Sequence, residues 1–470
     1  MPIHRWLCAS SAFSEDSSHI SSCAPGEPPY PMQESLSQKD ITVIGGGLAG
    51  MAAAIHLAKA GLRVLCIEAD PENNAVVGES LDWSAPDLLQ TLGLPMERLI
   101  AEDVATYKRH IAVNLSDGSS QRYIPSEWLG RPPWNVELRT LHVDRAQLKV
   151  ALREIVLSHG VMLLCDRVSK VERDGKRIIA LQTQGGQRID SQWFIDASGY
   201  ATSLLPRLFR LPAHEHGPGK VAIWSYFTVS DVVEGTTLYI DGTKPPYTEW
   251  VWEIPIHQNT ISVGYVSPGD AIKAKRQQGK AVADIYREKL SQTPRFEQLL
   301  QVTKGASPLV TSFRCRAYSG VAGPNWLVVG EAASMVDPMT SNGVTAALRH
   351  AAEASRLIVK HFYRGQLPWL ARTAYSRRIQ ALTKFFNNGI EKVIYDWPIR
   401  NRIGVFHAGD VYTVPAWSIN VLYSRIRPTG IISTELFSLF LASLSAAARI
   451  FHWLCTHFPK PSTPIAESAS

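Results

Sequence analysis

Three glycines and one acid near the start of the chain have the types and spacing that bind a dinucleotide. Gly45, Gly47 and Gly50 follow the apolar run Ile41–Ile44, and Glu68 ends the next apolar run. The first glycine suits a tight turn, the second lets the backbone approach a pyrophosphate, and the third lets helix and strand pack closely. The diphosphate would sit at a helix N-terminus, and Glu68 would accept hydrogen bonds from a ribose. We therefore expect a bound dinucleotide here.

A strand, a helix and a second strand must hold these residues in place. We expect the strands at Ile41–Ile44 and Arg63–Ile67, with an Ala- and Leu-rich helix at Met51–Ala60 between them. Asp144 is suited to the N-cap of an amphipathic helix that begins at Arg145. Later strands are expected at Val161–Cys165, Ile178–Gln182, Trp193–Ile195 and Trp326–Val329. This alternation is typical of an α/β fold.

The last of these strands leads into a second glycine and acid, Gly330 and Glu331, and a long helix begins after Asn342 and Gly343. An acid at the end of a strand can hydrogen-bond polyol hydroxyls. A helix start presents bare amides toward whatever occupies a cleft. This region repeats the pattern of the first: a strand, a glycine and an acid, with a helix start nearby. We therefore expect both regions to border one site.

Composition limits the class of protein. The 470 residues are 45% hydrophobic, enough for two or three domains with ample cores. The six cysteines are scattered without a C-x-x-C pair, which favours reduced thiols in a cytoplasmic protein over a metal site or a disulfide framework. No recognition helix or RNA-binding motif accompanies the net charge of +6, so nucleic-acid binding is not expected.

The two ends of the chain differ in character from its middle. Residues 1–38 are rich in Ser and Pro and carry acids, which predicts a disordered extension rather than a signal or transit peptide. Arg364–Arg427 holds ten Lys and Arg against three Asp and Glu, which suits either a solvated helical face or contact with an anionic membrane or acidic carrier. Leu436–Ala448 is apolar but too short to cross a bilayer, so we expect a packed or an interfacial helix.

Together these segments resemble the two-domain flavoprotein monooxygenase superfamily, over about Ile41–Arg364. The resemblance implies an FAD-binding, Rossmann-like domain of the glutathione-reductase type, an inserted antiparallel-sheet substrate domain and a helical C-terminal region. It implies that Gly330 and Glu331 hold the ribityl chain and that Arg145 lies near the diphosphate. The implied bounds are 39–205 with 320–364 for the FAD domain, 206–319 for the substrate domain and 365–470 for the C-terminal region. We expect a lid at Pro86–Trp134.

Further segments are similar to flavin-dependent halogenases that act on phenols and pyrroles. Gly78-Glu79-Ser80 matches a Gly-Glu-Ser segment, Trp250 to Pro255 fits W-x-W-x-I-P, and Asp337 to Gly343 fits D-P-x-x-S-x-G. By residue type alone, Trp250 and Trp252 also suit an ordinary buried strand that places both rings on one face. Lys108 follows Glu79 by 29 positions, as the family's essential lysine does. A lysine by itself is more often a solvated charge.

The resemblance implies that reduced FAD and oxygen convert a halide into hypohalous acid, in an enzyme of secondary metabolism. Backbone amides of Asn342 and Gly343 would hold the halide, Lys108 would direct the electrophilic halogen, and Trp250 and Trp252 would separate flavin from substrate. Thr340 stands beside Ser341 where tryptophan halogenases carry a glutamate. A phenol, pyrrole or enol is therefore the better expectation than a free indole.

The implied partners are a small electron-rich substrate, free or carrier-bound, a halide and a separate flavin reductase, because only one full dinucleotide motif is present. Two alternatives stay open. One is a flavin monooxygenase or reductase acting on an aromatic or isoprenoid lipid, which would suit a membrane-associated C-terminal region. The other is a non-catalytic flavin-binding redox protein.

Overall fold

The computed structural model describes residues 39–71, 77–132, 135, 139–230, 232–241, 247–302 and 308–410, with positions 413, 450, 453, 454 and 457. The expected disordered extension and the apolar segment 436–448 lie outside the described residues. Among those described, no helix combines the length and apolarity that crossing a bilayer requires.

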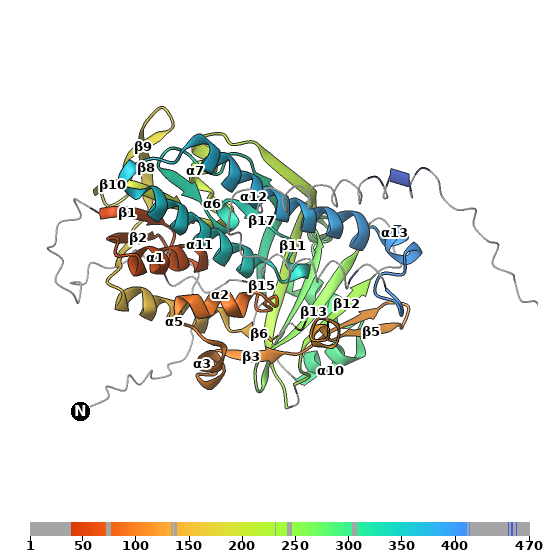
Figure 1. The fold of residues 1–470 in the computed structure, drawn as a ribbon. Helices are drawn as coiled ribbons and strands as arrows, with labels where there is room; N and C mark the ends of the chain where they lie inside the picture. The colour runs from red at the N-terminus through yellow and green to blue at the C-terminus, as the bar shows by residue number, and fades with distance from the viewer. Residues whose placement is uncertain are drawn as a thin grey trace, which may run out of the picture. The chain divides into compact units, whose positions relative to one another are not determined.

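The first sheet has seven strands and carries the dinucleotide motif (Figure 1). Its order is β7-β2-β1-β10-β9-β8, and β16 also pairs with β10. The strands are β1 (Lys39–Ile44), β2 (Val64–Glu68), β7 (Met162–Cys165), β8 (Val168–Asp174), β9 (Arg177–Thr183), β10 (Arg188–Asp196) and β16 (Trp326–Val328). The members β7, β2, β1, β10 and β16 pair in parallel, whereas β9 and β8 pair antiparallel. This α/β core confirms the expected fold class.

Three helices cover the parallel strands and start beside their carboxyl ends. They are α1 (Leu48–Lys59), α5 (Arg145–Ser158) and α11 (Gly343–His361), and α1 packs between the other two in Figure 1. Asp144 caps α5 as expected, because its Oδ1 accepts hydrogen bonds from the amides of Ala146 and Gln147 at 2.8 and 3.1 Å. The helix α1 begins three residues before the expected start, at the end of the glycine turn.

The second sheet has eight strands in the order β17-β15-β11-β14-β13-β12-β4-β5. They are β4 (Ile111–Leu115), β5 (Ser120–Tyr123), β11 (Ala213–Thr228), β12 (Thr236–Asp241), β13 (Glu249–His257), β14 (Thr260–Pro268), β15 (Leu309–Tyr318) and β17 (Ser334–Met335). All neighbours are antiparallel except β12 and β4. β3 (Ala105–Lys108) and β6 (Thr140–Val143) form a separate antiparallel pair.

The expectation of a lid at Pro86–Trp134 is wrong for the residues described. Its helices α2 (Ala85–Leu92), α3 (Met96–Ala101) and α4 (Pro125–Leu129) are short, and β4 and β5 between them extend the second sheet. The alternation Ile111, Val113 and Leu115 buries one face of β4 in the core of that sheet. The segment is therefore structural, and its tertiary partner β12 lies far along the chain.

Each face of the second sheet has its own apolar core. One face packs against α8 (Gly269–Gln277), α9 (Val282–Leu290) and α10 (Pro294–Val302). The other face carries Trp224, Trp250 and Trp252 and packs against residues 390–406. Alternation along β13 explains the division, because Val251 lies in the first core and its two tryptophan neighbours lie in the second.

The remaining elements connect the two sheets or follow them. Residues after β10 form α6 (Gly199–Thr202) and α7 (Leu204–Leu208). Short 3₁₀ turns η1 (Gly330–Ala332), η2 (Pro338–Thr340) and η3 (Phe362–Arg364) flank β17 and α11. The C-terminal part continues as α12 (Trp369–Gly389), the π-helix η4 (Ile390–Ile394) and α13 (Trp397–Arg402). The domain bounds inferred from the sequence stay a prediction.

Candidate functional site

A cavity of about 350 Å³ lies between the glycine turn after β1 and the tryptophan-bearing face of the second sheet. Ten residues singled out from the sequence line it: Gly47, Glu68, Glu79, Ser80, Arg145, Trp250, Trp252, Glu331, Ser341 and Gly343. Segments separated by almost three hundred positions thus meet at one place. The expectation that the two glycine-bearing regions border one site agrees with this arrangement.

The N-terminus of α1 opens directly onto this cavity. Gly45 has a φ of +103°, and a Cβ there would overlap the carbonyl oxygen of Ala197, so only glycine fits the turn. A Cβ at Gly50 would overlap the carbonyl oxygen of Gly45. At Gly47, in contrast, a Cβ would meet no atom within 4 Å, and no side chain caps the helix. The amides of the first turn are therefore available to an anionic ligand.

Three charged side chains surround this helix start. Glu68 accepts a hydrogen bond from the amide of Gly46 at 2.6 Å. Arg145 donates to the carbonyl oxygen of Gly78 at 3.0 Å. Glu331 is exposed on the cavity wall but surrounded by protein beyond it, so burial raises the pKa of its carboxyl while Arg145 opposes that shift. Burial likewise lowers the pKa of Arg145, and Glu331 opposes it.

Glu79 is buried at the edge of the cavity and tied to the second sheet. Its Oε1 accepts hydrogen bonds from Ser262 at 3.1 Å and Tyr226 at 3.2 Å. Burial raises the pKa of its carboxyl, although backbone amides, Ser262 and Arg145 oppose the shift. Ser262 also accepts from the indole N–H of Trp252 at 3.1 Å. Glu79 therefore links the segment after β2 to the tryptophan strand β13.

A second helix N-terminus, that of α11, faces the same cavity. A Cβ at Gly343 would meet no atom within 4 Å, and Asn342 provides no side-chain cap. The side-chain amide atoms of Asn342 are buried without a hydrogen-bond partner in the structure. Ser341, just before, adopts a left-handed conformation with a φ of +55°. Bare amides again meet open space, which favours an anion.

A chain of side-chain hydrogen bonds passes through this turn and ends at two basic residues of the β3–β6 pair, Lys108 and His142. Ser341 Oγ lies 3.1 Å from Ser80 Oγ, which lies 3.0 Å from Thr236 Oγ1. At one end, His142 Nε2 lies 2.9 Å from Thr236 Oγ1. At the other, Lys108 Nζ lies 3.4 Å from Ser341 Oγ. The three hydroxyl groups line the cavity, and the two basic groups lie behind them.

Lys108 is only 2% exposed and does not line the cavity itself. Its ammonium donates to the carbonyl oxygen of Leu81 at 2.9 Å and lies 4.8 Å from the ring centre of Trp83. Burial lowers the pKa of Lys108 to about 7, although the carboxylate of Asp82 opposes the shift. Near neutral pH, the amine and the ammonium are both populated.

His142 is fully buried, and the pKa of its imidazole is lowered well below the usual value by burial, with Lys108 adding to the effect. The ring is therefore neutral. Its Nδ1 has no hydrogen-bond partner in the structure. We assign the proton to Nε2, where it is donated to Thr236, because a bare buried nitrogen costs less than a bare N–H group.

The tryptophan pair forms one wall, with ring centres 5.7 Å apart. Both rings lie on the cavity face of β13, as their spacing predicted. Like Asn342, the candidates Thr340 and Gly330 do not line the cavity. Thr340 donates its hydroxyl to the carbonyl oxygen of Asp337 at 2.9 Å, and Gly330 packs where a Cβ would crowd Ala49 at 2.7 Å. Their contribution is to the shape of the backbone.

Sequence reasoning missed Thr236, His142, Asp82 and Trp83. Asp82 and Trp83 lie two and three positions after Ser80, the end of the Gly78-Glu79-Ser80 segment, so their position was a usable signal. Thr236 and His142 lie in strands that were not expected, and nothing in their local sequence marks them.

The residues around the cavity fit FAD. Two uncapped helix N-termini suit its diphosphate and a further anion. Carboxylates suited to sugar and polyol hydroxyls lie on the cavity wall at Glu68, the end of β2, and at Glu331, in the turn η1 after β16. The apolar remainder of the wall, including Trp250 and Trp252, suits a flat ring system.

Comparisons with known proteins agree. The tryptophan halogenase family model matches residues 134–390, and the FAD dependent oxidoreductase model matches residues 40–205. Tryptophan 2-halogenase of Chondromyces crocatus is 28% identical over 79% of this chain and 73% of its own. A 1H-pyrrole-2-carbonyl-[peptidyl-carrier protein] brominase of Pseudoalteromonas luteoviolacea is 28% identical over 68% of this chain and 77% of its own.

The fold is also similar to that of the flavin-dependent brominase Bmp2, with a TM-score of 0.66 and 21% identity over 83% of this chain and all of that one. FAD is the cofactor that these matches and the cavity indicate. Because the halogenase model spans more than half of the sequence, the chain belongs to the tryptophan halogenase family of FAD-dependent oxidoreductases.

Proposed function

We propose that this enzyme halogenates an electron-rich, phenol- or pyrrole-like substrate and that Lys108 delivers the halogen. The contact between Lys108 and Ser341 carries the proposal, because it joins a buried lysine to the turn that precedes an uncapped helix N-terminus. In that arrangement the Lys108 amine, which can bind an electrophilic halogen, lies next to the start of α11, where an anion would bind.

Bound FAD, once reduced, supplies together with oxygen the oxidising power that converts a halide into hypohalous acid. The protein's part is to hold and direct the reactants. The amides at Asn342 and Gly343 bind the halide, since helix-start N–H groups favour an anion without adding an oxidisable base. Trp250 and Trp252 separate the ring system of the cofactor from both the substrate and water.

Lys108 acts next, behind the hydroxyls of Ser80 and Ser341. As an ammonium it donates a hydrogen bond to hypohalous acid. As an amine its Nζ forms a bond to the halogen while the oxygen–halogen bond breaks, and the departing hydroxide takes one Nζ proton and leaves as water. The hydroxyl chain can support both states because each hydroxyl group can donate or accept. A pKa near neutrality, lowered by burial, makes both states accessible.

The substrate preference rests on Thr340 and on the relatives. The Thr340 hydroxyl is committed to the backbone of Asp337, so this position offers no carboxylate to assist deprotonation of an indole. A phenol or pyrrole is activated by its own heteroatom. The brominase relative acts, by its name, on a carrier-bound pyrrole. We infer that substrates are free or carrier-bound and that a separate reductase provides reduced FAD.

The decisive assay supplies the purified enzyme with FAD, a flavin reductase, bromide or chloride, and either monochlorodimedone or a panel of phenols and pyrroles. We expect halogenated product, identified by its isotope pattern in mass spectrometry, that depends on halide. Equal product without halide would overturn the proposal. An oxygenated product would instead favour a flavin monooxygenase.

The role of Lys108 is tested by Lys108→Met, with Lys289→Met as the matched control. Lys289 is also largely buried but pairs with Asp241 and Glu249 away from the cavity. We expect Lys108→Met to retain FAD and consume oxygen while halogen transfer falls by about a thousandfold or more. Transfer at the level of the control would return Lys108 to a structural role.

A further inference from the structure

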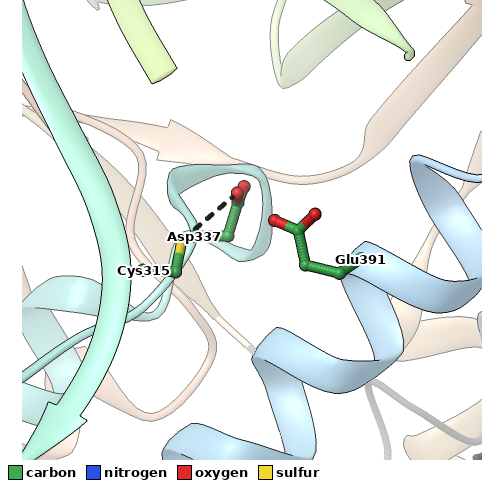
Figure 2. Close-up of side chains that lie close together, drawn as sticks. All are labelled: Cys315, Asp337 and Glu391. Atoms are coloured by element: carbon green, nitrogen blue, oxygen red, sulfur yellow. Dashed lines mark hydrogen bonds between the residues drawn. The ribbon is translucent and has the colours of Figure 1, made fainter. Parts of the chain in front are cut away.

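A buried ionic cluster lies behind the tryptophan wall and takes no part in the steps above. Its members come from the second sheet, the segment before β13, the turn before α11 and the C-terminal part: Lys220, Cys315, Tyr247, Asp337, Glu391 and Tyr395. Figure 2 shows the side chains of Cys315, Asp337 and Glu391 pointing toward one another. Three potential ligand atoms within 4.8 Å of one another would suit a metal ion.

The ammonium of Lys220 takes the place of such an ion. Lys220 Nζ lies 3.0 Å from Asp337 Oδ2, contacts Glu391 Oε1 and lies 3.9 Å from Cys315 Sγ. A bulge places it there, because the pairing of β11 with β15 shifts between His216 and Lys220. A Cβ at Gly217 within this bulge would overlap the Glu391 carboxylate. The cluster is therefore shaped around an internal cation.

The charge state of the cluster follows from its burial. Burial alone would lower the pKa of Lys220, but the Asp337 carboxylate raises it above the ordinary value, so the ammonium persists. Burial raises the pKa of Glu391, and Lys220 opposes the shift. Burial also raises the pKa of the Cys315 thiol, which stays neutral. One cation thus lies between two carboxylates, of which that of Asp337 is buried and that of Glu391 is largely buried.

Asp337 connects this cluster to the anion-binding turn. Its Oδ1 accepts a hydrogen bond from the amide of Met339 at 3.0 Å, and its carbonyl oxygen accepts from Thr340. These bonds close the short turn η2, after which Ser341 adopts its strained conformation. The turn that begins α11 is therefore attached to Lys220 through a single carboxylate.

Tyr395 connects the same carboxylate to the tryptophan wall. Its hydroxyl lies 3.1 and 3.2 Å from the two oxygens of Asp337 and accepts the indole N–H of Trp250 at 2.9 Å. The ring lies 4.4 Å from Lys220 Nζ and stacks on Tyr247 at 4.7 Å. Tyr395 follows the π-helix η4, an irregular turn type that is frequent at functional sites.

We propose that Lys220 and Tyr395 are positioning residues that hold the Trp250 wall and the 337–343 turn in one arrangement, and so set the affinity of the turn for halide. Resting on the proposed function, this assigns the C-terminal part a role in catalysis without contact with the reactants. Lys220 also cancels the negative charge of Asp337, which would otherwise repel an anion at the neighbouring amides.

The test uses Tyr395→Phe, which keeps the ring and removes the hydroxyl shared by Trp250 and Asp337. Tyr286→Phe is the matched control, because its buried hydroxyl donates to Val263 in the core on the opposite face of the sheet. Amide hydrogen exchange, followed by mass spectrometry on the FAD-loaded and FAD-free proteins, reports the turn directly. We expect exchange in peptides covering 337–343 to rise about tenfold in Tyr395→Phe only.

A bromide titration followed in the visible spectrum of bound FAD reports the affinity. We expect Tyr395→Phe to retain FAD but to need several-fold more bromide for half of the spectral change, and Lys220→Met to need more still. Unchanged exchange and an unchanged bromide midpoint in Tyr395→Phe would overturn the proposal, whether or not Lys220→Met folds. The two proposals can fail separately. If the wild-type protein halogenates no substrate, but exchange at 337–343 still differs between wild type and Tyr395→Phe, the proposed function is refuted and the positioning role stands.

Discussion

The two helix N-termini that face the cavity have the same chemistry but are built in different ways. α1 begins after glycines whose contacts lie within one strand-turn-helix unit and its sheet neighbour β10. α11 begins after Ser341, a residue with a side chain in a left-handed conformation, held through Asp337 by residues from β11 and from the C-terminal part. The first helix start is set by local backbone geometry, and the second by tertiary contacts.

This difference indicates how each site can be altered during evolution or by design. The glycine turn tolerates little change at Gly45 and Gly50, because a Cβ at either position would overlap backbone. A turn held by side chains can be retuned from a distance, since its partners lie on separate elements. The diphosphate half of the site would then stay constant while the half that handles halide varies.

The largest effect is expected from breaking the first helix start. Gly50→Ala places a Cβ against the carbonyl oxygen of Gly45, so the turn must move, whereas Gly47→Ala adds a Cβ with no protein atom within 4 Å. We expect Gly50→Ala to lower FAD affinity by about a hundredfold or more and to lower Tm. Gly47→Ala should keep Tm without FAD and lose affinity only. The absorbance of FAD retained after gel filtration and thermal unfolding measure both.

Equal behaviour of these two variants would contradict the division of roles between the glycines. In particular, a Gly47→Ala protein that binds FAD as tightly as wild type would place the diphosphate elsewhere in the cavity.

A second effect concerns the buried lysine beside the α11 start. The folded-state pKa of Lys108 is about 7, lowered by burial, whereas the pKa of a lysine in an unfolded chain is about 10.4. Between these values the unfolded chain binds more protons, so wild type gains up to about 1.4 kcal/mol of stability per pH unit as pH rises. We expect Lys108→Met to be the more stable protein at neutral pH and its advantage to shrink toward alkaline pH.

Thermal unfolding of both proteins without FAD across this pH range measures the difference. A constant offset in Tm would mean that Lys108 does not lose its proton in the folded protein, and would remove the amine from the proposed mechanism.

The smallest effect is expected from the hydroxyl chain. Thr236→Val removes the group that joins Ser80 to His142, and leaves a buried imidazole nitrogen without a partner. We expect a loss of about 1–3 kcal/mol in stability and a several-fold fall in halogen transfer with FAD binding unchanged. The neighbouring Thr237→Val is the control, as it lies on the opposite face of β12. Similar losses in both variants would argue that the chain has no specific role.

Much of the dinucleotide half was predictable from the sequence. The glycines, Glu68 and the cap at Asp144 belong to short sequence motifs, and the predicted strands β1, β2, β7, β9, β10 and β16 occur where apolar runs mark them. The period-two spacing of Trp250 and Trp252 placed both rings on one face correctly.

The second half was less predictable for a physical reason. The segment that holds β4 and β5 was expected to be a lid, because the partner of β4 is β12, more than a hundred positions along the chain, and β5 pairs only with β4. Nothing in the local sequence marks Lys220, since its partners Asp337 and Glu391 lie more than a hundred residues away. Long-range charge pairing leaves no local pattern.

The sequence by itself determined the fold class, the helix start that suits a diphosphate and the family resemblance, because backbone conformation and short-range periodicity depend on neighbouring residues. The tertiary structure alone decided which polar groups meet: Lys108 with Ser341, Thr236 with His142, and Lys220 with Asp337 and Glu391. A buried polar group is stable only beside its partner, and the folded chain alone brings that partner near.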